Sequence, residues 1–125
     1  MSAKILVVDD SRLARRMVRQ LLEELGHVVE EAADGAEALE RYVINRHDVV
    51  FLDMVMHGMY GLEVLNKFRE LNPQLPVIIA SADIQKSTRE QVRAAGAVAM
   101  VNKPLKKEEL ISVLSTVLSG GVAWT

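Results

Sequence analysis

The stretch Asp48-Val49-Val50-Phe51-Leu52-Asp53 places four consecutive apolar residues between two carboxylates. Because such a run leaves no polar side chain to face water, we predict a strand that is buried on both faces. Asp53 then lies at the exit of that strand, and residues 54–58 have the composition of a loop. An ionisable group at the exit of a core strand is a cap or part of a site, and the loop that follows favours a site.

Four more strands are predicted, over residues 4–9, 28–32, 77–81 and 97–102. The first ends on Asp9, and Asp10 comes directly after it. The strand over 77–81 ends on the hydroxyl of Ser81, and the last one leads into Lys103-Pro104. The strand over 28–32 is half polar and is therefore expected at an edge of the sheet.

Helical patterns alternate with these strands. The first helix is expected to be capped by Asp10 or Ser11 and to end at Gly26. Its apolar residues keep a 3.6-residue period at Leu13, Ala14, Met17, Val18, Leu21, Leu22 and Leu25. Further helices are expected from Asp34-Gly35 with Ala36, Leu39 and Val43 on one face, from Gly61, over residues 84 to about 95 before Gly96, and through Leu110, Ile111, Leu114, Val117 and Leu118.

The order of these elements is strand–helix repeated five times, which predicts an α/β protein with a parallel sheet covered by helices on both faces. We expect one domain over residues 1–125, with its core at about 3–118. Residues 119–125 carry the only tryptophan and are interpreted as a frayed end or the start of a linker. In such folds, ligands bind outside the carboxyl ends of the strands.

Composition narrows the class of protein. Half of the residues are hydrophobic, 26% are charged, and the net charge is only −2, whereas a dedicated nucleic-acid binder is usually basic. The absence of cysteine excludes disulfides and thiolate metal sites. Since no apolar segment is long enough for a signal peptide or a membrane span, we expect a cytoplasmic protein that binds neither membrane nor nucleic acid.

Five chemically useful groups therefore meet at one edge of the predicted sheet: Asp9, Asp10, Asp53, Ser81 and Lys103. Two carboxylates about 4 Å apart repel by roughly 4 kcal/mol at an effective dielectric constant near 20, so three of them require a cation. With oxygen ligands only, Mg²⁺ is favoured and Mn²⁺ is the alternative.

A hard cation, a lysine and a hydroxyl around one carboxylate suit phosphoryl transfer. Asp53 is the best nucleophile because it stands alone on a central strand, whereas Asp9 and Asp10 form a pair suited to metal binding. Lys103 offsets charge on the phosphoryl oxygens, and Ser81 donates a hydrogen bond to them.

The chain resembles a response-regulator receiver domain of the stand-alone, chemotaxis type. The resemblance covers about residues 3–118 and rests on motifs in the right order and spacing: Val7-Val8-Asp9-Asp10-Ser11, Phe51-Leu52-Asp53-Met54, Gly61, Ile79-Ala80-Ser81-Ala82 and Asn102-Lys103-Pro104. It implies a flavodoxin-like (βα)5 three-layer sandwich with sheet order 2-1-3-4-5 and a cis peptide before Pro104.

The resemblance also implies roles for the site. Asp53 is the phosphoacceptor, and Mg²⁺ is held by Asp9, Asp10, Asp53 and the backbone carbonyl of Val55. The partners are a histidine kinase or histidine phosphotransfer domain and a protein target on the face of the fourth helix, fifth strand and fifth helix. The domain is a monomer or weak dimer and no enzyme beyond its own phosphorylation and autodephosphorylation.

Two positions depart from the family pattern. Met100 stands where receivers usually carry the aromatic residue that moves inward on phosphorylation, so a thioether would have to fill that space. His57 stands where many relatives have proline, and it is either a plain loop histidine or a group that senses pH or approaches the phosphoryl group.

Two surface patterns remain open. Arg12, Arg15, Arg16 and Arg19 form a basic stripe on the first helix, which is either a solvated face with an Arg19–Glu23 pair or a docking surface for the phosphodonor. Lys86, Arg89 and Arg93 give the fourth helix a polar face or a target surface.

Two other functions remain as alternatives. One is a metal-dependent phosphohydrolase with an aspartyl-phosphate intermediate, although enzymes resembling haloacid dehalogenases carry Asp-x-Asp on their first strand where this chain has adjacent Asp9-Asp10. The other is a receiver-like interaction module that no longer needs phosphorylation, which Met100 keeps open.

Overall fold

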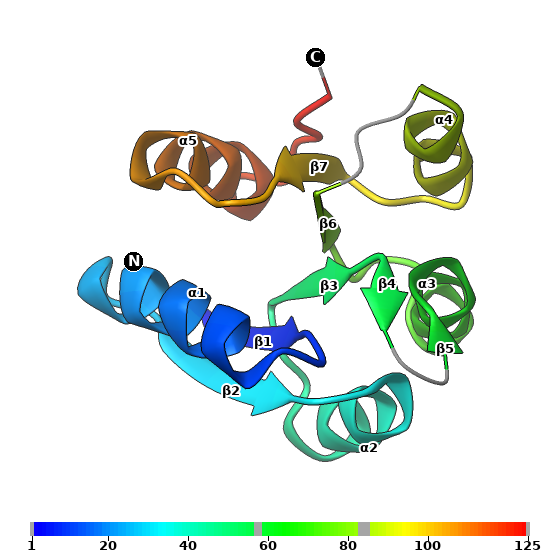
Figure 1. Ribbon diagram of the computed structural model, residues 1–125, viewed down its shortest axis with the longest axis horizontal. Coiled ribbons are helices and arrows are strands. Elements are labelled where there is room, and N and C mark those ends of the chain that lie inside the picture. The colour runs from blue at the N-terminus through cyan, green and yellow to red at the C-terminus, as the bar shows by residue number, and fades with distance from the viewer. Residues whose placement is uncertain (1, 57–58, 83–85, 125) are drawn as a thin grey trace.

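A computed structural model describes residues 2–56, 59–82 and 86–124 of the chain (Figure 1). Five parallel strands form one sheet in the order β2-β1-β3-β6-β7, which confirms the predicted order. These strands are β1 (Lys4–Val8), β2 (Val28–Ala32), β3 (Val49–Asp53), β6 (Val77–Ser81) and β7 (Ala99–Asn102). The half-polar β2 lies at an edge, as predicted.

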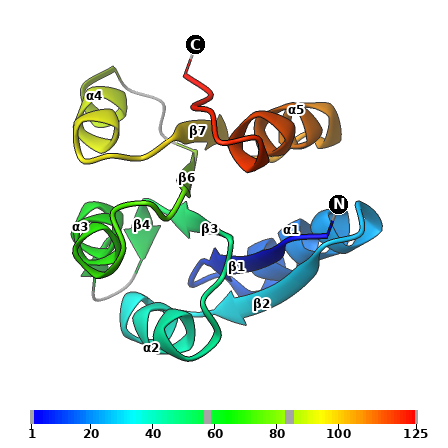
Figure 2. The same ribbon diagram turned by 180° about the vertical axis from the view of Figure 1, so that it is seen from behind.

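Helices cover both faces of the sheet, as Figures 1 and 2 show. They are α1 (Arg12–Glu24), α2 (Gly35–Asn45), α3 (Gly61–Leu71), α4 (Lys86–Ala94) and α5 (Lys107–Leu118). Helices α1 and α5 share one face and α2, α3 and α4 the other. The strand β3 between these layers is almost fully buried, since Val49, Val50 and Leu52 are 0% exposed. Each of those residues contributes about 1.5–3 kcal/mol of burial free energy.

Local sequence signals set the ends of the helices. The hydroxyl of Ser11 accepts from Ala14 N at 3.2 Å and caps α1, and the carboxylate of Asp34 accepts from Glu37 N at 2.8 Å and caps α2. Gly26 at φ +92° and Gly96 at φ +100° follow α1 and α4 in the left-handed region. Among the described residues, every helix is too short or too polar to cross a membrane.

Several of the apolar residues that define the predicted helical periods are exposed. Leu13 is 72% exposed, Met17 55%, Val43 49% and Ile111 44%. In α1 only Val18 and Leu22 are buried, because its apolar stripe is wider than the surface that the sheet and α5 offer it. The period of the apolar residues thus predicted the helix correctly but did not identify which of those side chains are buried.

The carboxyl-terminal segment also differs from expectation. Ala123 forms a parallel bridge with Ala99, and Trp124 is half-buried against the core layer under α4. The interpretation of residues 119–125 as a frayed end is therefore wrong for the described part of that segment.

Residues 54–58 were predicted as loop, but β4 (Val55–Met56) pairs antiparallel with β5 (Met59–Tyr60). This short pair brings the chain back close to Asp53, and α3 begins there with Gly61. A Cβ atom on Gly61 would lie 2.7 Å from the carbonyl oxygen of Asp53 and from the Cα of Met54, so only glycine fits there. The amide of Gly61 donates to the Met54 carbonyl at 2.7 Å and closes the turn.

Candidate functional site

Three carboxylates meet at the carboxyl edge of the sheet. Asp9 and Asp10 directly follow β1, and Asp53 is the last residue of β3, which pairs with β1. One carboxylate oxygen from each of the three residues lies within 4.8 Å of the chosen oxygens of the other two. The side chain of Asp9 is only 7% exposed and that of Asp53 12%. At such spacing and burial, mutual repulsion requires positive charge nearby.

Lys103 supplies one positive charge. Its Nζ lies 2.5 Å from Oδ2 of Asp9 and 3.3 Å from Oδ1 of Asp53. Burial disfavours the charged ammonium, but the two carboxylates outweigh that effect and raise the pKa of Lys103 above its usual range. The lysine is therefore held as a cation between both acids.

Ser81 ends β6, the strand next to β3, and is buried at 3% exposed. Its backbone carbonyl accepts from the amide of Lys103 at 2.9 Å, which fixes the start of the segment that follows β7. A cis peptide joins Lys103 to Pro104, as the resemblance implies. The sheet register thus places the predicted hydroxyl and the predicted lysine at the same edge as the acids.

Asp9 is held from several sides. Its Oδ1 accepts from Ser11 N at 2.9 Å, and its carbonyl accepts from Nη1 of Arg15 at 2.6 Å. Sequence reasoning treated Arg15 only as part of a surface stripe and missed this contact. The signal was its place one turn into the helix that starts beside Asp9, where a long side chain can reach back to the strand end.

The remaining predicted groups lie around the loop after β3. Val55 is the first residue of β4, one residue beyond the buried Met54, and the metal-binding role of its carbonyl stays a prediction. His57 lies outside the described residues. Asp9, Asp10 and Asp53 offer only hard oxygen donors, which fit Mg²⁺ and also Mn²⁺.

A family model described as response regulator receiver domain matches residues 5–115. The chain belongs to the receiver-domain family. Receiver domains of two-component response regulators carry their phosphoacceptor in this fold, and the phosphohydrolase alternative is not favoured.

The receiver has relatives among curated proteins and solved structures. It is 39% identical over 118 residues to the response regulator MprA of Mycobacterium ulcerans (strain Agy99), covering 94% of this chain and 51% of that protein. The chemotaxis protein CheY4 of Vibrio cholerae has a TM-score of 0.87 at 33% identity, covering 92% of this chain and 98% of that one. A LuxR-family response regulator from Aurantimonas sp. SI85-9A1 reaches a TM-score of 0.93 at 28% identity, covering 99% of this chain and 90% of that one. The chain spans about half the length of the curated relatives it matches.

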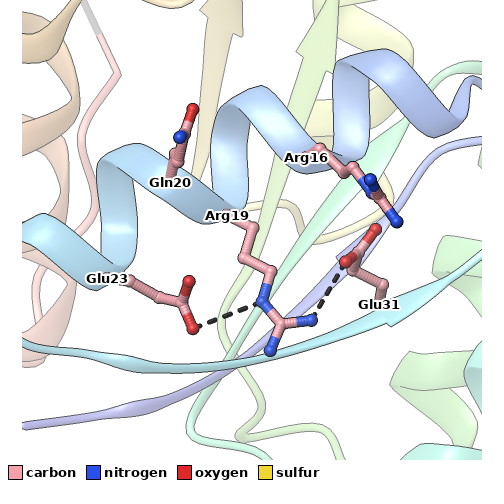
Figure 3. A pocket seen from close by; sticks show the side chains of 5 residues that line it. All are labelled: Arg16, Arg19, Gln20, Glu23 and Glu31. Carbon is pink, nitrogen blue, oxygen red and sulfur yellow. Dashed lines mark hydrogen bonds and ion pairs between the residues drawn. The ribbon is translucent and has the colours of Figure 1, made fainter.

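The basic stripe of the receiver divides into two parts. Arg19 pairs with Glu23 at 3.3 Å, as predicted, and with Glu31 at 3.0 Å, and Arg15 pairs with Glu31 at 3.2 Å. Figure 3 shows Arg19 between the two glutamates, in a pocket of about 380 Å³. Within the described ranges, no ion pair involves Arg12 or Arg16, and both are exposed.

An apolar groove of about 360 Å³ lies between α1 and the segment after β7. The groove is lined by Ala14, Met17, Val18, Leu21, Ala82, Lys103, Pro104 and Leu105. The groove thus brings Lys103 of the site together with apolar side chains of α1.

Met100 lies on β7 and is half-buried against the core layer that α2, α3 and α4 cover. Trp124 packs against the same layer. This receiver therefore has an aromatic side chain at the α4–β7 corner, but the side chain comes from the segment after α5 rather than from position 100.

Proposed function

We propose that this receiver accepts a phosphoryl group from a phosphohistidine onto Asp53 in a Mg²⁺-dependent reaction and thereby changes its affinity for a protein target. The observation that carries the proposal is the position of Lys103, whose ammonium lies between Asp9 and Asp53 while Asp10 completes the cluster. A charged lysine at the acceptor carboxylate is suited to neutralising an incoming phosphoryl group.

In the proposed step, an oxygen of the Asp53 carboxylate attacks phosphorus. The new O–P bond forms as the P–N bond of phosphohistidine breaks, and the electron pair goes to the imidazole nitrogen, which takes up a proton from solvent. Lys103 offsets the charge on the phosphoryl oxygens, and Ser81 donates a hydrogen bond to one of them. The receiver itself would therefore supply the acceptor carboxylate, the hydroxyl that positions the phosphoryl group and the positive charge that neutralises it.

Asp9, Asp10 and Asp53 would hold the Mg²⁺ ion, together with the carbonyl of Val55. The donor set fits because three carboxylate oxygens come within 4.8 Å of one another. When bound, Mg²⁺ supplies positive charge beside the acceptor carboxylate. The contacts of Asp9 to Ser11, Arg15 and Lys103 hold this carboxylate in place for that purpose.

Mass spectrometry tests the acceptor. Wild-type protein incubated with acetyl phosphate and Mg²⁺ should gain one phosphoryl group, and Asp53→Asn should gain none. Asp48→Asn is the matched control, because Asp48 precedes the same strand and its carboxylate accepts from Lys4 N at the opposite edge. No adduct in the wild type would contradict the proposal, and sustained turnover of unrelated phosphate esters would indicate the hydrolase.

The phosphodonor is proposed to dock on α1. Leu13 and Met17 are exposed there, each next to an exposed arginine in the chain, Arg12 and Arg16. Met17 also lines the apolar groove that Lys103 borders. A histidine kinase or histidine phosphotransfer domain is the partner that this surface fits, because exposed apolar anchors give affinity and arginines raise association rates.

The remaining parts of the proposal concern output. The target is proposed to bind the face of α4, β7 and α5, with the receiver cytoplasmic and monomeric or weakly dimeric. Apart from its own phosphorylation and autodephosphorylation, the receiver is proposed to have no catalytic activity. Arg89 and Arg93 of α4 belong to this face.

A further inference from the structure

The outer edge of β7 is partly covered by the segment after α5. The amide of Ala123 donates to the carbonyl of Val98 at 2.8 Å, and Ala123 bridges Ala99 in parallel orientation. Figures 1 and 2 both show the carboxyl-terminal trace beside β7, between α4 and α5. Because β7 is the last strand in the sheet order, this segment occupies an edge that would otherwise accept another strand.

Trp124 anchors the segment. Its indole Nε1 donates to the carbonyl of Ala97 at 3.0 Å. The guanidinium carbons of Arg89 and Arg93 lie 5.6 Å and 5.5 Å from the centre of its ring. These arginines are four residues apart, hence neighbours on one face of α4. One aromatic side chain therefore joins the edge of β7 to α4.

Two glycines direct the chain into this position. Gly120 has φ +88°, a conformation that favours glycine after a helix end. Gly121 N donates to the carbonyl of Thr116 at 3.0 Å, and a Cβ atom on Gly121 would lie 3.2 Å from that oxygen. The segment thus leaves α5 by a tight turn and reaches the β7 edge at Ala123, five residues after the helix ends at Leu118.

We propose that the β7 edge and the Arg89–Arg93 face of α4 form an acceptor surface for an extended peptide of a protein target, with an aromatic anchor, and that Val122–Trp124 occupies this surface in cis. The segment in cis illustrates the recognition mode, namely backbone pairing to a sheet edge plus one ring in contact with two arginine side chains of α4. Two cationic neighbours of the ring favour a target segment with acidic residues beside its aromatic one. This acceptor surface is part of the proposed target-binding face, and the identification of its ligand as a protein target rests on the proposed function.

The segment that occupies the surface in cis sets a minimum affinity that a target needs in order to bind. Its contacts are few, and Val122 is 63% exposed, so an incoming strand can replace them one for one. Because the segment is tethered, it competes at a high effective concentration. A weak peptide is then excluded, and only a target with further contacts binds.

A peptide titration tests the surface. The probe is the synthetic peptide Gly-Gly-Val-Ala-Trp-Thr, which has the sequence of residues 120–125. Followed by amide NMR shifts, it should bind full-length Trp124→Ala at β7 and α4, and bind the wild type at least about tenfold more weakly, because the tethered copy competes there. A peptide with alanine for tryptophan should not bind. Equal affinity for both proteins, or no binding to Trp124→Ala, would overturn the proposal.

A second measurement does not depend on that variant. The protein has a single tryptophan, so acrylamide quenching reports Trp124 alone. The double variant Arg89→Ala/Arg93→Ala should raise the quenching constant by about twofold or more, since both ring contacts are lost. An unchanged constant would overturn the proposal. Both measurements should give the same result in Asp53→Asn, so failure of the acceptor surface and failure of the phosphoacceptor are distinguishable.

Discussion

The ammonium of Lys103 is closer to Asp9, at 2.5 Å from Oδ2, than to Asp53, at 3.3 Å from Oδ1. The lysine is thus bound chiefly by Asp9, a proposed metal ligand, and only secondarily by the proposed acceptor Asp53. A phosphoryl group on Asp53 would place new anionic oxygens beside the same ammonium. An exchange of Lys103 from Asp9 to those oxygens would link the proposed acceptor to the start of the segment after β7.

Lys103→Ala should destabilise the metal-free protein, because Asp9 and Asp53 then face each other without their cation. We expect a loss of roughly 1–3 kcal/mol in the free energy of unfolding, less than for a fully buried pair. Saturating Mg²⁺ should restore most of it. Urea titration with and without Mg²⁺ measures both values. Lys107→Ala is the control, since its 3.7 Å pair with Glu24 is largely exposed, and a Lys103→Ala deficit that Mg²⁺ leaves unchanged would contradict this account.

The same variant should separate phosphorylation from its consequence. Lys103→Ala retains Asp9, Asp10 and Asp53, so acetyl phosphate and Mg²⁺ should still give an adduct by intact mass. The amide shifts of β7 and α4 that accompany phosphorylation in the wild type should be absent, because the group that connects the phosphoryl oxygens to β7 is missing. Identical shift changes in both proteins would count against the role given to Lys103.

Gly61→Ala should damage the site through the backbone. The added Cβ would lie 2.7 Å from the Asp53 carbonyl and the Met54 Cα, which forces the acceptor strand and α3 apart. We expect a loss of about 1–3 kcal/mol in stability and slower labelling by acetyl phosphate. Gly26→Ala should cost about 1 kcal/mol through its positive φ while leaving the labelling rate unchanged. Equal labelling rates in the two variants would refute a positioning role for Gly61.

The sequence predicted most of the polar groups at the carboxyl edge of the sheet. An apolar run that ends on a polar residue indicates both a buried strand and the side chain that lies at its end. Asp9, Asp53 and Ser81 were placed correctly for that reason. The exposure of Leu13 and Met17 was not predictable from their period, since the period gives a stripe and only the neighbouring surfaces decide its width. Trp124 was missed because its partners, Ala97 and α4, are distant in the chain and leave no local pattern.

Acid stability should depend on Glu30, which joins β2 to the end of α2. Burial raises the pKa of its carboxyl, but hydrogen bonds from Asn45, His47 and Arg41 outweigh burial and lower that pKa below 4.5. A lowered folded-state pKa means that the contribution of Glu30 is complete above pH 4.5 and is lost as the pH falls through the folded value. Glu30→Gln should therefore lose less stability than the wild type between pH 6 and about pH 3.5, as urea midpoints would show. An identical loss in both proteins would exclude this contribution.

Donor docking on α1 gives the last prediction. Leu13→Asp and Met17→Asp should leave the free energy of unfolding nearly unchanged, since these side chains are 72% and 55% exposed. Phosphotransfer from a panel of phosphorylated histidine phosphotransfer domains should slow by about tenfold, which corresponds to the loss of an interface anchor of 1–2 kcal/mol. Labelling by acetyl phosphate should be unaffected, because that small donor needs no docking surface.

Ile44→Asp is the matched control for this prediction, because Ile44 is 69% exposed on α2, away from the groove beside Lys103. It makes the same change of charge on a similarly exposed apolar residue. Slowing by Leu13→Asp and Met17→Asp but not by Ile44→Asp would place the donor on α1. Equal slowing by all three would attribute the effect to net charge, since added negative charge reduces the attraction of an acidic donor wherever it lies on the surface.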